Sequence, residues 1–445
     1  MNESPQIELA GAAVAVVGMA RSGFAAAELL LAKGAGVRAV DARITPELRD
    51  KVNRLRIDLY PQEERSFEGV DLVVISPGVA ADDPVLNGLR ARGVRVVGEV
   101  ELAGWYLQGP VIGITGSNGK TTTTALTGHI LENAGVPCQV GGNIGRPPTA
   151  MVATSRPDGW NVLELSSFQL EVIETFRARV GAVLNVTPDH LDRHYTIENY
   201  AAAKARLFIN QIPGDFAVLN HDDAITRAYA SGTRGEVVWF SSTHEVSPGA
   251  YLDGSRILLN AQLLMEAHEV PLRGTHNLEN TMAAAAMAQL AGATHAQIRA
   301  AVMTFPGVEH RLEFVRERNG VSWYNDSKAT NVDAALKAVA AFPGGLWIIL
   351  GGKDKNSDYT PLAAPLKQKA HAALLIGAAA EKIRAQLSGE VRMIACRTLD
   401  AAVQEARARA QPGDTVLLAP ACASFDQFDN YEHRGREFKR LVGEL

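Results

Sequence analysis

The residues best placed to do chemistry form the segment Thr-Gly-Ser-Asn-Gly-Lys-Thr, residues 115–121. The apolar run Val111–Ile114 before it predicts a buried strand, and the apolar periodicity after it predicts a helix. A strand, a glycine-bearing loop, Lys-Thr and a helix are together typical of a phosphate-binding loop. The helix start offers backbone N–H groups to an anion, Lys120 adds a positive charge, and Thr121 offers a hydroxyl to magnesium.

This loop is shorter than the usual pattern, because Ile114 stands where a glycine is expected five residues before Gly119. The alternative is a glycine turn that opens an ordinary helix. Such turns rarely carry Lys-Thr at the helix start after a buried strand, so we predict a nucleotide phosphate site. The residues expected to line it are Gly116, Ser117, Asn118, Gly119, Lys120, Thr121 and Thr122.

Polar residues also end two further predicted strands. Glu164 ends the run 161–165, where a carboxylate is costly unless it meets a cation. In phosphate-loop proteins such an acid commonly holds magnesium; pairing with a structural Arg or Lys is the alternative. His190 follows the run 182–186 in a cluster with Asp189, Asp192 and His194. The clustering favours a role near metal and phosphate, and the spacing alone leaves open which residue acts.

Several candidates lie further along the chain. Lys204 belongs to a predicted helix with Thr196 as its N-cap, and its spacing alone does not distinguish it from a surface lysine. Arg311 lies at a predicted domain junction, where it could clamp a phosphate or serve only as a linker charge. Asp326, Lys328 and Thr330 follow a strand-like run and could face the same cleft.

Two polar turns in the last third of the chain suggest a small-ligand site. The turn 351–355 follows a buried strand directly, which places Lys355 at the carboxyl edge of a sheet. Residues 424–435, SFDQFDNYEHRG, read as a ligand pocket or as a helix start. The alternative is an amphipathic terminal helix, for which Phe425, Phe428 and Tyr431 have the helical spacing.

The elements that position these residues alternate between strands and helices, which predicts an α/β fold with mainly parallel sheets. The length of 445 residues suggests about three domains. We expect a Rossmann-like domain at 1–98, a phosphate-loop mononucleotide-binding domain at 99–307 and a second Rossmann-like domain at 308–445. Other predicted strands are 14–18, 37–41, 72–76, 94–98, 217–220, 237–240, 346–350, 373–376, 391–394 and 415–418, with a β-meander at 256–270 and helices at 23–33, 83–92, 277–291 and 399–410.

The first predicted strand is followed by a turn that departs from the dinucleotide fingerprint. Ala20 stands where that fingerprint has glycine, and its methyl hinders close approach of a pyrophosphate, so NAD is disfavoured. Asp41 ends the next strand, where either a ribose-binding acid or an ordinary turn residue would stand. The loop Ser76–Gly78 follows the third run at the carboxyl edge, where ligands of such sheets bind.

Composition narrows the function classes. The net charge of −5 without a basic block does not suggest nucleic-acid binding. Three cysteines lie far apart without a Cys-x-x-Cys pair, which predicts neither a disulfide framework nor a zinc site and fits a reducing cytosol. No signal peptide or transmembrane span is recognisable, so we expect a cytoplasmic protein.

The motifs TGSNGKTT, ELSSFQLE, NVTPDHLDRH, Tyr-x-x-x-Lys at 200–204, HR at 310–311, DSKATN, GGKDK and PACASFDQF, in this order, resemble the Mur ligase family. The resemblance covers all three segments. It implies that ATP phosphorylates the carboxylate of UDP-N-acetylmuramoyl-L-alanine, and that the amine of D-glutamate attacks the acyl phosphate. It also implies a monomer of the peptidoglycan pathway, two Mg²⁺ ions and CO₂ that carbamylates Lys204.

The resemblance assigns roles residue by residue. Lys120 holds the terminal phosphates, and the metal ligands are Thr121, Glu164, His190 and carbamylated Lys204. The nucleoside contacts are Asn280 and Asp326, and the further phosphate contacts are Arg311 and Lys328. The UDP-substrate residues are Ser22, Arg43, Ser76 to Gly78 and Asn143, and the glutamate residues are Thr330, Lys355, Ser424, Phe425 and Tyr431.

Two positions depart from the family pattern, and three other readings stay open. Ala42 replaces a hydroxyl that relatives often place at the uracil end, and Tyr431 stands where Phe is common.

The first alternative function is that of a sister ligase, or a folylpolyglutamate synthase-like enzyme, that adds another amino acid. The second is a phosphate-loop NTPase with a regulatory or binding role. The third is an NAD-dependent oxidoreductase, which Ala20 disfavours.

Overall fold

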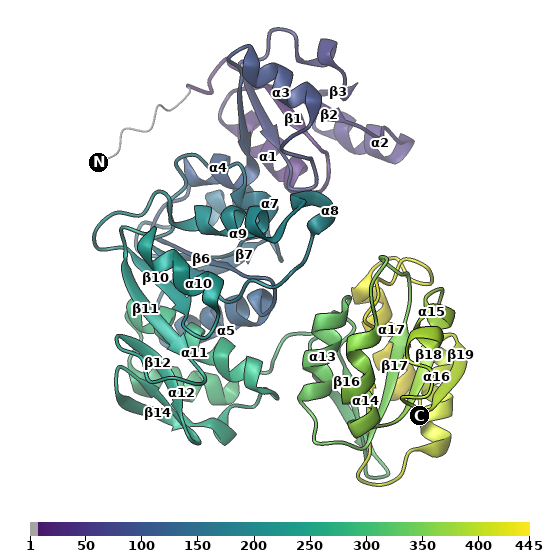
Figure 1. Cartoon of the computed structure of the whole chain (residues 1–445). Coiled ribbons are helices and arrows are strands. Elements are labelled where there is room, and N and C mark those ends of the chain that lie inside the picture. The colour runs from purple at the N-terminus through teal and green to yellow at the C-terminus, as the bar shows by residue number, and fades with distance from the viewer. Residues whose placement is uncertain (1–7) are drawn as a thin grey trace. The chain divides into compact units, whose positions relative to one another are not determined.

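The computed structural model describes residues 8–445, which form three β-sheets with helices packed on them (Figure 1). They fall into two compact units, residues 8–267 with Glu279–Met303 and His268–Leu278 with Thr304–Leu445. The mixed α/β architecture with mainly parallel strands confirms the predicted fold class. The domain boundaries at 98 and 307 stay predictions.

The first sheet has the strand order β3-β2-β1-β4-β5 and is entirely parallel. Its strands are β1 (Ala13–Val17), β2 (Gly36–Asp41), β3 (Asp58–Pro61), β4 (Leu72–Ile75) and β5 (Arg95–Gly98), and its helices are α1 (Arg21–Ala32), α2 (Pro46–Arg54), α3 (Pro84–Ala91) and α4 (Glu99–Gly104). The strand order reverses between β1 and β4, so the loops after these two strands flank a ligand-binding crevice. β3 was not predicted, because its four residues are partly exposed and form no apolar run.

The central sheet has the order β14-β13-β12-β11-β10-β9-β6-β8-β7, parallel except for the β12–β13–β14 meander. The meander predicted at 256–270 contains β13 and β14 but misses β12. Its strands are β6 (Val111–Thr115), β7 (Cys138–Gly142), β8 (Trp160–Glu164), β9 (Val180–Val183), β10 (Phe216–Asn220), β11 (Glu236–Ser241), β12 (Gly249–Asp253), β13 (Arg256–Leu259) and β14 (Gln262–Glu266). The helices of this stretch are α5 (Lys120–Asn133), α6 (Pro148–Met151), α7 (Ser167–Leu170), α8 (Leu191–His194), α9 (Ile197–Ala205), α10 (Ala224–Ala228), α11 (Thr275–Leu290) and α12 (His295–Thr304). β6 carries the phosphate-binding loop and lies between β9 and β8 in the interior of this sheet.

The third sheet has the order β15-β16-β20-β17-β18-β19, with only β15 antiparallel to its neighbour. Its strands are β15 (Glu313–Arg318), β16 (Val321–Asn325), β17 (Leu346–Gly351), β18 (Ala370–Ile376), β19 (Met393–Arg397) and β20 (Thr415–Leu418), and its helices are α13 (Val332–Ala340), α14 (Ala363–Lys369), α15 (Ala380–Gln386), α16 (Leu399–Arg409) and α17 (Tyr431–Gly443). Apolar clusters cover both of its faces, which explains why its strands read as continuous apolar runs. The terminal helix considered for residues 424–435 does form, as α17, but it begins only at Tyr431, so Phe425 and Phe428 precede it and Phe425 is 65% exposed.

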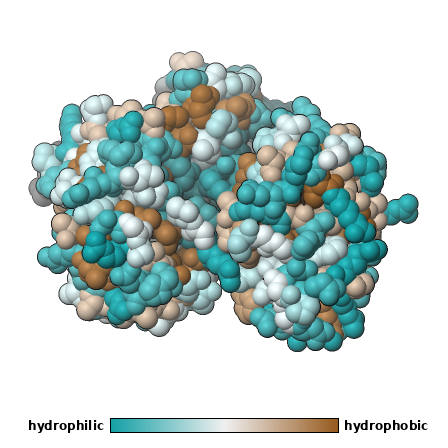
Figure 2. All heavy atoms as spheres, turned by 60° about the horizontal axis from the view of Figure 1, so that its bottom comes forward, coloured by the Kyte–Doolittle hydropathy of each residue, from teal (hydrophilic) through white to brown (hydrophobic). Residues whose placement is uncertain are grey.

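Figure 2 shows hydrophilic and hydrophobic side chains interspersed over one face of the molecule. Among the described residues, no helix combines the length and the apolar character that a membrane crossing needs.

Candidate active site

The phosphate-binding loop joins β6 to α5 and is held by a neighbouring loop. Asn185, after β9, accepts from the backbone N–H of Asn118 at 2.8 Å and donates to its carbonyl oxygen at 3.1 Å. Ser117 donates its backbone N–H to the carbonyl of Asn185 at 2.9 Å and its hydroxyl to that of Thr187, also at 2.9 Å. The N-cap residue of α5 is Gly119, which has no side chain to cap the helix. The bonds to Asn185 and Thr187 fix the loop at the start of α5, where backbone N–H groups can bind an anion.

Gly119 is required by its conformation and by its neighbour. Its φ of 85° lies in the left-handed region, and an added Cβ would lie 2.3 Å from Oδ1 of Asn280. The same Oδ1 accepts from the hydroxyl of Thr123 on α5 at 3.2 Å. Asn280, a predicted nucleoside contact on α11, thus lies against the phosphate-binding loop.

Thr121 and Glu164 meet beside the loop. The hydroxyl of Thr121 donates to Oε2 of Glu164 at 2.7 Å, and Nδ2 of Asn143 donates to Oε1 at 2.9 Å. Glu164 is only 2% exposed. A buried carboxylate and a hydroxyl at this distance are hard oxygen donors that suit Mg²⁺. The donor set therefore fits the predicted metal site.

Lys204 lies on α9 and is 1% exposed. Its ammonium donates to the carbonyl of Gly116 at 3.0 Å and lies 4.2 Å from the ring centre of Tyr200. Lys120 donates to the same carbonyl at 2.7 Å. Burial, and then the positive charge of Lys120, hold the pKa of Lys204 well below its usual value. The interpretation of Lys204 as a surface lysine is therefore wrong.

The structure places the two histidines of the NVTPDHLDRH motif in different environments. His194 is buried, with its ring nitrogens 2.9 Å from the Ser167 hydroxyl and 3.1 Å from Glu171. Burial, and secondarily Arg193, lower the pKa of His194 to about 4, so it is neutral and structural. His190 has φ of 52°, and its side chain is 47% exposed. Of the two, His190 is the one accessible to a metal ion.

A cavity of about 790 Å³ lies at the crevice of the first sheet, between the loops after β1, β2 and β4 and residues of the central region. All the predicted UDP-substrate residues line it, namely Ser22, Arg43, Ser76, Pro77, Gly78 and Asn143. Both carboxylate oxygens of Asp41 accept backbone N–H groups, from Met19 at 2.7 Å and Arg43 at 2.9 Å. Asp41 thus orders the turn at residues 41–43, which lines the cavity. The cavity also contains Gln169, which the sequence did not single out.

The predicted glutamate residues lie in the loops after three neighbouring strands of the third sheet. Thr330 follows β16, Lys355 follows β17, and Ser424 and Phe425 follow β20, while Tyr431 begins α17. The Lys328 ammonium lies 3.8 Å from the ring centre of Tyr431. The topology thus brings these residues to one edge.

Arg434 of α17 holds these loops together and was missed by the sequence reasoning. The guanidinium is 1% exposed and donates to the Ser327 carbonyl at 2.8 Å and the Cys422 carbonyl at 3.2 Å. Its Nε donates to the Ser327 hydroxyl at 2.9 Å. Burial lowers the pKa of Arg434 to about 10, so the group stays charged near neutral pH. Nothing in the segment that ends in EHRG indicates that this arginine is buried.

Asp326 and Arg311 lie together in the second unit. Burial raises the pKa of Asp326 to about 7, and the charge of Arg311 opposes that rise. His276, also near Arg311, has its pKa lowered to about 4, first by burial. An acid of this kind is common at binding sites, where a ligand completes its hydrogen bonding.

Comparisons with known proteins identify the family. The descriptions "Mur ligase MurD-like, N-terminal domain", "Mur ligase middle domain" and "Mur ligase, glutamate ligase domain" match residues 12–98, 114–288 and 310–422. The chain is 61% identical over 439 residues to a UDP-N-acetylmuramoylalanine--D-glutamate ligase of Solibacter usitatus, covering 99% of each chain. It is 50% identical over 447 residues to an enzyme of the same name from Acidobacterium capsulatum, covering 98% of this chain and 97% of that one.

Solved structures support the fold. A pseudomurein peptide ligase type C from Methanothermus fervidus superposes with a TM-score of 0.61 at 18% identity, covering 98% of this chain and all of the other. A UDP-N-acetylmuramate-alanine ligase from Thermotoga maritima gives a TM-score of 0.61 at 19% identity, covering 97% and 99% of the two chains. With the full-length relatives and three matched domains, the chain belongs to the Mur ligase family.

Proposed function

We propose that this protein joins D-glutamate to UDP-N-acetylmuramoyl-L-alanine, at the cost of ATP, in peptidoglycan precursor synthesis. Family membership makes it an ATP-dependent ligase that works with Mg²⁺. The observation that carries the choice of substrates is the 61% identity, over 99% of both chains, to a relative named for that reaction. The cavity at the first sheet supports it, since all the residues assigned to the nucleotide substrate line this one cavity, and its volume suits a small-molecule ligand.

In the first step the substrate carboxylate attacks the γ-phosphorus of ATP, giving an acyl phosphate and ADP. The loop 116–119 and Lys120 hold the terminal phosphates against the start of α5. When bound, Mg²⁺ would neutralise phosphate charge. Thr121, Glu164 and His190 would act as metal ligands, and carbamylated Lys204 would hold a second ion. Asn280, Arg311, Asp326 and Lys328 bind the rest of the nucleotide.

In the second step the amine of D-glutamate attacks the acyl carbon. The tetrahedral adduct loses phosphate and a proton and leaves the amide. Lys355 pairs with a glutamate carboxylate, and Thr330, Ser424, Phe425 and Tyr431 form the remaining contacts. These residues lie in loops at one edge of a sheet, which is the usual place for a ligand in this kind of fold.

Carbamylation of Lys204 is a further part of the proposal. CO₂ adds only to an uncharged amine, and the lowered pKa of Lys204 supplies that form. The resulting anion has carboxylate-like oxygens that suit Mg²⁺. We also propose a monomeric cytoplasmic enzyme with domains 1–98 for the UDP substrate, 99–307 for ATP and 308–445 for the amino acid.

The test is amino-acid-dependent release of ADP in the presence of UDP-N-acetylmuramoyl-L-alanine. The amino acids to compare are D-glutamate, L-glutamate, L-alanine, lysine and diaminopimelate. We expect release with D-glutamate alone. Release with another member of the set would indicate a sister ligase, and ATP hydrolysis indifferent to all five would point to an NTPase that is not a ligase.

A further inference from the structure

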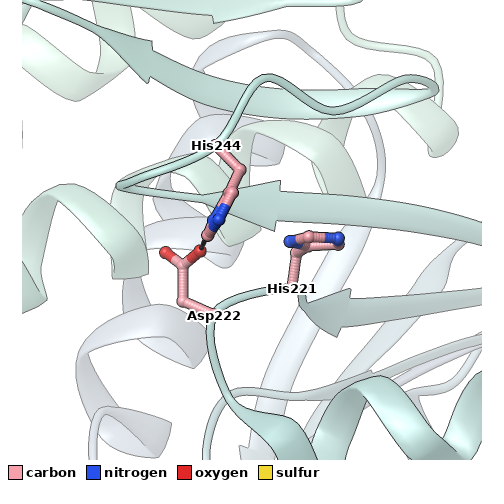
Figure 3. A group of neighbouring side chains, drawn as sticks. All are labelled: His221, Asp222 and His244. Carbon is pink, nitrogen blue, oxygen red and sulfur yellow. Dashed lines mark hydrogen bonds and ion pairs between the residues drawn. The ribbon is translucent and has the colours of Figure 1, made fainter.

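Three side chains with metal-binding atoms lie together at the carboxyl edge of the central sheet. His221 and Asp222 follow β10, and His244 lies in the loop after β11 (Figure 3). One ligand atom from each lies within 4.8 Å of the other two. Neither the phosphate-binding loop nor the cavity of the first sheet involves these residues, so the proposed ligase reaction leaves them without a role.

Two of the three atoms already have the spacing of metal ligands. Nδ1 of His244 lies 3.0 Å from Oδ1 of Asp222. In a tetrahedral zinc site with bonds of about 2.0–2.1 Å, neighbouring ligand atoms are separated by about 3.3 Å. The Asp222–His244 pair therefore needs to open by only a few tenths of an ångström. Because its ligand atom lies within 4.8 Å of the other two, His221 must approach by at most roughly 1.5 Å on the same geometry.

Asp222 is oriented by its surroundings. Its Oδ1 accepts from the hydroxyls of Ser241 at 2.6 Å and Thr243 at 2.7 Å, and its Oδ2 accepts the backbone N–H of Ser242 at 2.7 Å. Outer hydrogen bonds of this kind fix the orientation of carboxylate ligands in metal sites.

His221 has an unused ring nitrogen. Its Nδ1 is buried and has no hydrogen-bond partner among residues 8–445. The ring lies edge-on to Trp239, with centroids 5.4 Å apart, and 5.1 Å from the ring of His244. A ring nitrogen without a hydrogen-bond partner can serve as a metal ligand. The His244 side chain is 58% exposed, so an ion can enter from solvent.

We propose that His221, Asp222 and His244 bind a divalent transition-metal ion of the Zn²⁺ type, with water as the fourth ligand. Two imidazoles and one carboxylate suit Zn²⁺ better than Mg²⁺, which prefers oxygen ligands alone. The ion links the loops after β10 and β11. The prediction of no zinc site considered only cysteines, and the sequence conceals this group because His244 lies a whole strand beyond Asp222.

The test uses Co²⁺ as a spectroscopic probe on the full chain, in excess Mg²⁺ so that oxygen-rich sites are filled. We expect one bound Co²⁺ per chain with the visible absorption of a four-coordinate site, displaced by Zn²⁺. His221→Ala and His244→Ala should each weaken Co²⁺ binding at least ~10-fold. Asp222 is left unchanged, because its loss would also release the loop that Ser241 and Thr243 anchor.

His371→Ala is the matched control. His371 makes the same kind of bond, 3.1 Å to Asp414, and belongs to no three-residue group among the described residues. The His371→Ala variant should leave Co²⁺ binding unchanged. The absence of Co²⁺ absorption, or the same affinity in both cluster variants as in the parent, would overturn the proposal. Circular dichroism checks that each variant is folded, and ADP release tests the ligase proposal separately.

Discussion

The ammonium groups of Lys120 and Lys204 donate to one carbonyl oxygen, that of Gly116, at 2.7 and 3.0 Å. Two cations on one acceptor repel each other, and the repulsion adds to the cost of burying Lys204. Lys204 is therefore poised to lose its proton. Addition of CO₂ would turn it into an anion and convert the repulsion from Lys120 into attraction.

Replacement of Lys204 tests this relationship. Lys204→Ala should lower kcat at least ~100-fold, because the ligand to the second metal ion is lost. Short carboxylic acids should restore part of the activity by entering the space that the side chain leaves. The measurement is ADP release with and without added acetate, with stability checked by urea unfolding. Full activity in the unsupplemented variant would reject the carbamate.

Glu164→Gln tests the first metal site. The amide keeps the shape of the side chain and its bond with Thr121 but removes the charge that holds Mg²⁺. We expect the Mg²⁺ concentration for half-maximal ADP release to rise at least ~10-fold. The matched control is Glu171→Gln, since Glu171 pairs with Arg193 at 3.1 Å instead. An unchanged Mg²⁺ dependence in Glu164→Gln would remove Glu164 from the metal site.

Arg434→Met tests whether the buried guanidinium positions the amino-acid loops. The loss of its bonds to Ser327 and Cys422 should raise the KM for glutamate ~10-fold or more while the KM for UDP-N-acetylmuramoyl-L-alanine stays the same. The control Arg436→Met changes an exposed arginine of the same helix. A fall in kcat with both KM values unchanged would show that Arg434 does not position the glutamate site.

Asp326→Asn tests the buried acid of the second unit. The pKa of Asp326 is about 7 in the folded protein, above the ordinary value of 3.8. Its contribution to stability is therefore present below pH ~4 and is lost as the pH rises to about 7. The parent should lose about 2–4 kcal/mol more unfolding free energy than the variant over this range, measured by urea titration. Parallel pH profiles would show that Asp326 ionises normally.

Local patterns in the sequence were sufficient to predict the fold class and the chemistry of the phosphate-binding loop. Gly119, Lys120 and Thr121 are close in sequence, so their spacing alone specifies the turn and the helix start. Most strands were predicted because buried parallel strands read as apolar runs, whereas β3 has no such run. The resemblance of distant motifs to one family supplied the substrates.

Only the tertiary structure decided which distant residues meet. Lys204 reads as a surface lysine, and its burial against Gly116 depends on the packing of α9 against the loop. His194 and His190 are four residues apart, yet one is buried and structural and the other half exposed. The tertiary structure alone also shows that Arg434 is internal and that His221, Asp222 and His244 lie together. Parallel strand order brings together loops that are far apart in the sequence.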